Sequence, residues 1–139
     1  MYYWLIVTSW LITGFGLFIV ILAQTPLFEN FNKPVLAVFN LTPEIIVAQK
    51  LLIWLYSVLG ATMAGWGVFI WFLLKNAFVK KEKWAWRALA ISMMVWFIPD
   101  TMISAIYGVY FNVVVNSLLL LIIALPLSFT YKDFFPDNN

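Results

Sequence analysis

The sequence contains no cysteine and no histidine. Without cysteine, a disulfide framework, a thiolate nucleophile and a thiolate-ligated metal are all excluded. Without histidine, the chain lacks the commonest metal ligand and the commonest general base at neutral pH. Because so little chemistry survives these two absences, we predict no catalytic residue, no metal and no cofactor.

Charged residues are also scarce. They make up 10% of the 139 residues, whereas hydrophobic residues make up 65%; soluble domains are roughly 25% charged and 45–50% apolar. The net charge of +2 is too small to indicate a nucleic-acid partner, and basic residues cluster in one loop only. The composition therefore predicts a small membrane protein whose partner is the lipid bilayer in which it lies.

Long apolar runs predict four transmembrane helices, at about 2–23, 51–74, 84–107 and 110–131. A helix needs about 20 residues to cross roughly 30 Å of hydrocarbon. The run beginning at Trp84 is too long for one crossing, and Gly108 permits the chain to reverse within it. No alternation of the β-barrel type appears, so helices are the spanning structure. We predict an all-α membrane protein, a single four-span antiparallel transmembrane helix bundle over residues 1–139.

The orientation follows from the charges of the loops. Between the second and third spans, Glu82 is the one acid among five basic residues, Lys75, Lys80, Lys81, Lys83 and Arg87. The positive-inside rule places this loop in the cytoplasm, and with four spans both termini lie there too. The first run has no positively charged leading region and no convincing cleavage site near Ala23, so we expect a retained anchor. Trp4, Trp84 and Trp86 fit an inner aromatic belt.

The connection between the first two spans, residues 24–43, is predicted to be an ordered loop. A short interfacial helix over Pro34–Phe39 is the alternative. Thr42, Pro43 and Glu44 have the composition of a helix start, so the second helix is expected to begin near Pro43.

Asp100 is the only acidic residue in the apolar sequence between Trp84 and Lys132. A carboxylate in hydrocarbon costs several kcal/mol unless it is protonated, paired or facing water. Asp100 belongs to a series of residues with a constant step of four, namely Ser92, Trp96, Asp100, Ser104, Gly108, Asn112 and Asn116. Since residues four apart share a helix face, each of the last two spans should carry one polar face.

A reversal near Gly108 would bring these two faces together, with Asp100 opposite Asn116 and Ser104 opposite Asn112. Two interpretations stay open. The side chains are a ligand site, with Asp100 as a proton or cation site and Trp96, Ser104, Asn112 and Asn116 lining it. Alternatively, they are hydrogen-bonding contacts that only hold the helices together.

Small residues mark a second kind of contact. Gly60 and Ala64, with Gly67 one turn further on, let another helix approach closely, as do Ala61 and Gly65. This surface packs against the first span of the same chain, or it binds a membrane protein partner or forms a homo-oligomer.

The pattern Trp96-Phe97, Asp100-Thr101, Ser104, Gly108, Asn112 and Asn116 resembles a motif of small uncharacterised bacterial four-helix membrane proteins of the BphX-like and DoxX-like kind. The resemblance covers residues 96–116 only. It implies a four-helix bundle in a bacterial inner (cytoplasmic) membrane, and it transfers no catalytic role to any residue.

Three classes of function are compatible with these features. The first expectation is a non-enzymatic accessory, scaffold or interaction protein. The alternative is binding or transport of a small lipophilic or cationic ligand between the third and fourth spans, at Asp100. The second alternative is a lipid- or quinone-linked enzyme subunit, which a single buried acid without histidine or cysteine supports least.

Overall fold

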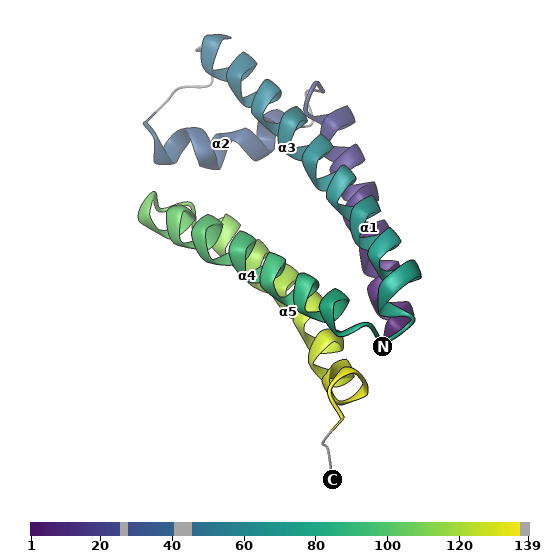
Figure 1. The fold of residues 1–139 in the computed structure, drawn as a ribbon. Coiled ribbons are helices and arrows are strands. Elements are labelled where there is room, and N and C mark those ends of the chain that lie inside the picture. Colours follow the sequence, from purple (N-terminus) through teal and green to yellow (C-terminus); the bar gives the residue numbers. More distant parts are fainter. Residues whose placement is uncertain (26–27, 41–45, 137–139) are drawn as a thin grey trace. The chain divides into compact units, whose positions relative to one another are not determined.

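The computed structural model describes residues 1–25, 28–40 and 46–136. Its helices are α1 (Tyr2–Leu22), α2 (Glu29–Val38), α3 (Ile46–Leu73), the π-helical segment η2 (Leu74–Phe78), α4 (Lys83–Ile106) and α5 (Tyr110–Phe134) (Figure 1). Within these described ranges there is no strand. Four helical stretches are long and apolar enough to cross a membrane, namely Tyr2–Leu22, Gln49–Phe78, Lys83–Ile106 and Tyr110–Phe134. The prediction of an all-α, four-span protein is therefore confirmed.

The chain forms two compact units. Unit 1 contains Met1–Trp10 and Val68–Asn139, and unit 2 contains Leu11–Gly67. Helices α1 and α3 contribute to both units, whereas α4 and α5 belong to unit 1 and α2 belongs to unit 2. The two units are thus not consecutive halves of the chain.

The helix bounds follow the predicted spans closely for α1 and α4. Helix α3 goes further than predicted, because it continues through the π-helical turn Leu74–Phe78. The polar residue Asn76 does not end this helix, since its amide donates to the Phe72 carbonyl at 2.8 Å. The turn buries the side chains of Leu74, Ala77 and Phe78, and Phe78 packs on Phe134 of α5 with a centroid separation of 4.5 Å.

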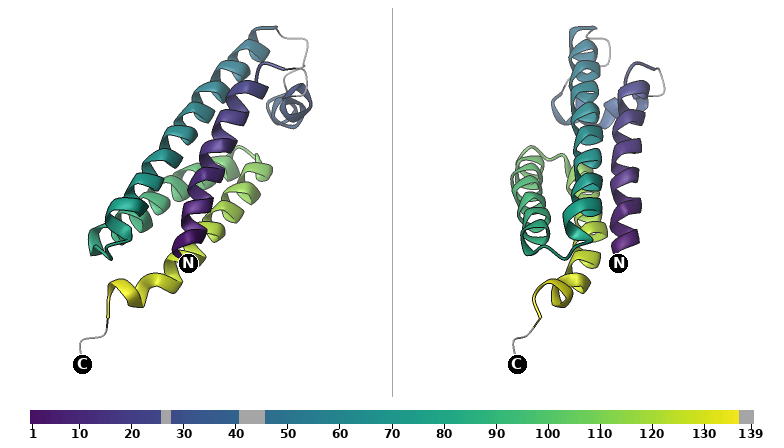
Figure 2. Two further views of the ribbon diagram at one scale, coloured as in Figure 1. Left: turned by 90° about the vertical axis from the view of Figure 1, so that its right-hand side faces the viewer. Right: turned by 45° about the vertical axis from the view of Figure 1, so that its right-hand side comes forward.

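The connection between α1 and α3 contains the helix α2, where an ordered loop was predicted first; the alternative helix over Pro34–Phe39 overlaps its second half. Helix α2 buries Leu36 and exposes Lys33 and Ala37, so it is amphipathic, and it lies across the direction of α1 and α3 in unit 2 (Figure 2). Just before α2, Phe28 packs edge-on against Tyr56 of α3 at 5.0 Å. The predicted helix start at Thr42–Glu44 lies outside the described residues, and α3 is described from Ile46.

In unit 2 the backbones of α1 and α3 touch at two glycines. A Cβ atom added to Gly16 would lie 2.5 Å from the Gly60 carbonyl oxygen and 2.6 Å from the Ala64 nitrogen. A Cβ atom added to Gly60 would lie 2.6 Å from the Gly16 carbonyl oxygen. Gly60 and Ala64 therefore pack against the first span of the same chain. The partner or homo-oligomer contact through Gly60, Ala64 and Gly67 stays a prediction.

We expect Gly16→Ala to destabilise the α1–α3 pair by about 1–3 kcal/mol, because the new methyl group clashes with backbone atoms, which cannot move aside by a change of side-chain rotamer. The measurement is unfolding of the purified protein in mixed detergent micelles.

Gly14→Ala is the matched control, since a Cβ atom there meets nothing within 4 Å. Equal stability of the Gly16→Ala and Gly14→Ala variants would contradict the close backbone contact.

Candidate functional site

Helices α4 and α5 form an antiparallel hairpin in unit 1 (Figure 1). The turn is closed by Gly108, which has a φ of +74°. The Val109 amide donates to the Ser104 carbonyl at 2.8 Å and the Gly108 amide donates to the Ala105 carbonyl at 3.1 Å. This pair of bonds is a Schellman motif, in which a left-handed residue satisfies the last carbonyls of a helix. The reversal predicted at Gly108 is confirmed.

Three of the predicted site residues form one hydrogen-bonded cluster near this turn. Asn112 Nδ2 of α5 donates to Asp100 Oδ1 at 3.0 Å and to Ser104 Oγ at 2.8 Å, both on α4. The Ser104 hydroxyl donates to the Asp100 backbone carbonyl at 2.7 Å, and its oxygen lies 3.4 Å from Asp100 Oδ1. One amide group, with both of its protons used, therefore binds two residues that lie one turn apart.

The fourth polar residue, Asn116, makes a different contact from the one predicted. Its Nδ2 donates to Thr101 Oγ1 at 3.3 Å. The expected pairing of Ser104 with Asn112 is confirmed, whereas Asp100 pairs with Asn112 and Asn116 with Thr101. Asn112 reaches Asp100 because Asp100 and Ser104 share a helix face, and Thr101 is turned by about 100° from Asp100 toward Asn116.

Asp100 lies six residues before Ile106, the end of α4, or about 9 Å along the helix axis. Its side chain and that of Asn112 are partly buried, and Ser104 and Asn116 are buried. Trp96 is partly buried one turn before Asp100, and its ring centroid lies 6.4 Å from that of Phe97. Trp96 thus lies one helical turn from the cluster along α4.

A second set of contacts joins α4 and α5 at the other end of the hairpin. Trp86 Nε1 of α4 donates to the Leu127 carbonyl of α5 at 2.9 Å. The buried Thr130 hydroxyl donates to the same carbonyl at 2.8 Å. Sequence reasoning placed Trp86 in an interfacial belt and missed this contact. The signal was the indole N–H, which usually finds a partner when a tryptophan is buried.

An apolar groove of about 170 Å³ lies between α4 and α5, on the Trp86 side of the cluster. Its lining residues are Trp86, Ala90, Met93 and Met94 of α4 and Leu120, Ala124, Leu127 and Ser128 of α5. None of the predicted site residues lines this groove, so the groove and the polar cluster are separate features of the hairpin.

The chemistry available at the cluster is narrow. It holds one carboxyl, hydroxyls and two amides, which can donate and accept hydrogen bonds or hold a proton or a cation. In the part of the chain that the structure describes, no three His, Cys, Asp or Glu residues are grouped so that they could hold a metal ion.

Comparison of the chain with protein-family models, with curated proteins and with solved structures found no match. The resemblance of residues 96–116 to BphX-like and DoxX-like proteins is thus a prediction without further support.

We expect Asn112→Ala to reduce the free energy of unfolding by about 1–2 kcal/mol, because the amide makes two interhelical bonds and such bonds contribute roughly 0.6–1.7 kcal/mol each in membranes. A double-mutant cycle of Asn112→Ala with Asp100→Ala, measured by unfolding in mixed micelles, should give a coupling of about 1 kcal/mol.

Asn76→Ala is the control, because the Asn76 amide donates within its own helix, to the Phe72 carbonyl. A loss for Asn112→Ala no larger than that for Asn76→Ala, with no coupling to Asp100, would show that the cluster does not hold the hairpin.

Proposed function

We propose that the protein is a non-catalytic integral membrane protein that serves as an accessory, scaffold or interaction subunit. The observation that carries this proposal is the mutual hydrogen bonding of Asp100, Ser104 and Asn112. The polar groups of the hairpin, which cost free energy to place in hydrocarbon, bind one another and thereby hold α4 on α5. Since these groups are used to join helices, the outer surfaces of the helices are what the protein offers to a partner.

The proposed location is a bacterial inner (cytoplasmic) membrane, with both termini in the cytoplasm. The positive-inside rule supports this orientation. In unit 1 the N-terminus, the basic connection from η2 to α4 and the end of α5 with Lys132 lie toward the same end (Figure 1). The turn at Gly108 lies at the other end of the hairpin and carries no charge.

Exposed apolar side chains supply the surface that a partner would contact. On α4 and α5 they include Val95, Ile106, Phe111 and Phe129, and on α3 the small residues Ala61 and Gly65 are exposed. Large side chains of this kind contact lipid in a membrane protein unless another protein covers them.

A second candidate function is binding or transport of a small cationic or lipophilic ligand at Asp100. One observation favours it: both contacts to the carboxyl group go to Oδ1, and Oδ2 has no hydrogen-bond partner among residues 1–25, 28–40 and 46–136. An acceptor oxygen on a partly buried acid is available to a proton or a cation.

The scaffold proposal is tested by photo-crosslinking in native membranes. A benzoylphenylalanine placed at Ala61 on α3 should give one adduct of defined mass, from a single partner or from a second copy. The same probe at Leu17, exposed on α1, is the control for random collisions. Asp100→Asn should leave the adduct unchanged, because the amide oxygen at position 100 still accepts from Asn112.

Uptake of tetraphenylphosphonium, a lipophilic cation, into proteoliposomes distinguishes the second candidate. We expect uptake equal to that of protein-free liposomes over pH 5 to 8. Uptake that exceeds this background and disappears in Asp100→Asn would overturn the scaffold proposal and establish transport at Asp100.

A further inference from the structure

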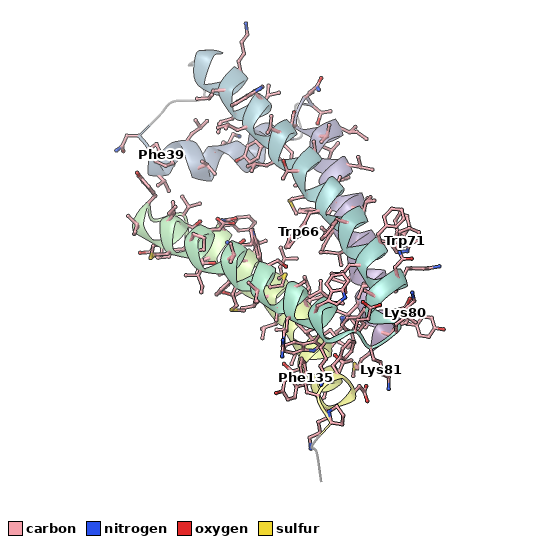
Figure 3. The ribbon with its side chains drawn as sticks, viewed as in Figure 1. Phe39, Trp66, Trp71, Lys80, Lys81 and Phe135 are labelled. Atoms are coloured by element: carbon pink, nitrogen blue, oxygen red, sulfur yellow. The ribbon has the colours of Figure 1, made fainter. Side chains whose placement is uncertain are left out.

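Two cations share one aromatic ring at the end of the hairpin away from Gly108. Lys83 Nζ lies 5.7 Å and Arg87 Cζ lies 5.3 Å from the centroid of Phe135. Phe135 itself stacks on Tyr131 at 5.0 Å and meets Trp86 edge-on at 5.6 Å. We call Lys83, Trp86, Arg87, Tyr131 and Phe135 the basic-aromatic platform; Phe135 is labelled beside the last turns of α5 in Figure 3.

Among the residues that the structure describes, no ion pair balances the charges of this platform. The described residues provide no ion pair for Lys83 or Arg87, and both side chains are exposed. The nearby acid Glu82 accepts from Trp84 Nε1, and Asp133 on the last turn of α5 is exposed. Cation–π contacts hold the two like charges close together but leave their charge in place, so the platform is complementary to an anion.

The apolar groove continues from the platform. Trp86 belongs to both, because its ring contacts Tyr131 and Phe135 while it also lines the groove. The groove runs from Trp86 along α4 to Met94 and along α5 from Ser128 to Leu120. Met94 and Ser128 are exposed, so the groove opens on the outer surface of the hairpin. Small residues on both walls, Ala90 and Ala124, leave its volume unfilled.

We propose that the platform and the groove together form a binding site for one anionic phospholipid. The phosphate of the headgroup lies against Lys83 and Arg87, and one acyl chain occupies the groove between Ala90 and Ala124. Basic sites between helices at the cytoplasmic surface have the chemistry that anionic headgroups require. A free phosphate would leave the groove empty. The positively charged group of a zwitterionic headgroup would be repelled by Lys83 and Arg87.

This site goes beyond the proposed scaffold function and is independent of it. It uses none of the residues of the Asp100 cluster, and the outcome of its test does not depend on whether α3 contacts a partner.

Native mass spectrometry of the intact detergent-solubilised protein tests the site by titration with phosphatidylglycerol and with phosphatidylcholine. We expect one phosphatidylglycerol to bind at least about tenfold more tightly than phosphatidylcholine. Lys83→Gln together with Arg87→Gln should weaken phosphatidylglycerol binding by roughly thirtyfold, since each cation near an anionic headgroup contributes about fivefold to the affinity.

The matched control is Lys80→Gln together with Lys81→Asn. It removes the same amount of charge from the neighbouring connection between η2 and α4, where Lys80 and Lys81 lie (Figure 3), and asparagine tolerates the φ of 58° at position 81. We expect this pair to change phosphatidylglycerol binding by less than about twofold, because neither lysine contacts Phe135.

The groove is tested separately by Ala124→Phe and Ala90→Phe, which should each weaken phosphatidylglycerol binding while thermal unfolding in detergent shows a folded protein. Glycerol 3-phosphate should not compete. Equal losses in the two charge pairs, equal affinity for the two lipids, unchanged binding in both groove variants, or competition by glycerol 3-phosphate would each overturn the site.

Discussion

Hydrocarbon contains no water to hydrogen-bond a polar group, and this constraint organises the second half of the chain. Asp100, Ser104, Asn112 and Asn116 each find a partner within the hairpin. At the opposite end the Trp86 indole reaches the Leu127 carbonyl. The hairpin is therefore joined by hydrogen bonds near both ends, and between the helices at the Trp86 end lies an apolar groove. The same physics that makes a buried acid costly makes its pairing a strong restraint on how α4 and α5 meet.

Unit 2 solves the problem of helix association in a different way. Lipid is as apolar as the side chains of these helices, so burial of apolar area does little to hold them together. Gly16 and Gly60 instead let the backbones of α1 and α3 touch, and close packing over this contact supplies dispersion attraction. One part of the chain thus relies on polar pairing and another on small residues, which are the two devices available to membrane helices.

Much of the hairpin site could be predicted, because the relevant distances depend on helix periodicity and on one turn. The four-residue step placed Ser104 and Asn112 on facing sides, and Gly108 set the position of the reversal. The partner of Asn116 could not be predicted, since a rotation of one residue about the axis of α4 decides between Asp100 and Thr101. Helix α2 was predicted only as an alternative, and only over Pro34–Phe39, for another reason: asparagines and a proline are weak helix formers, and the helix buries Leu36.

Composition and periodicity were enough to establish an all-α membrane protein with four spans, because the thickness of hydrocarbon and the need to pair every backbone group leave a chain of this kind few alternatives. Contacts between residues far apart in the chain depended on how the helices rotate and where they cross. The Trp86–Leu127 bond, the gathering of Lys83 and Arg87 on Phe135 and the groove beside them follow from packing. Hydropathy does not encode these features, since it reports how much a segment avoids water and not which neighbour it meets.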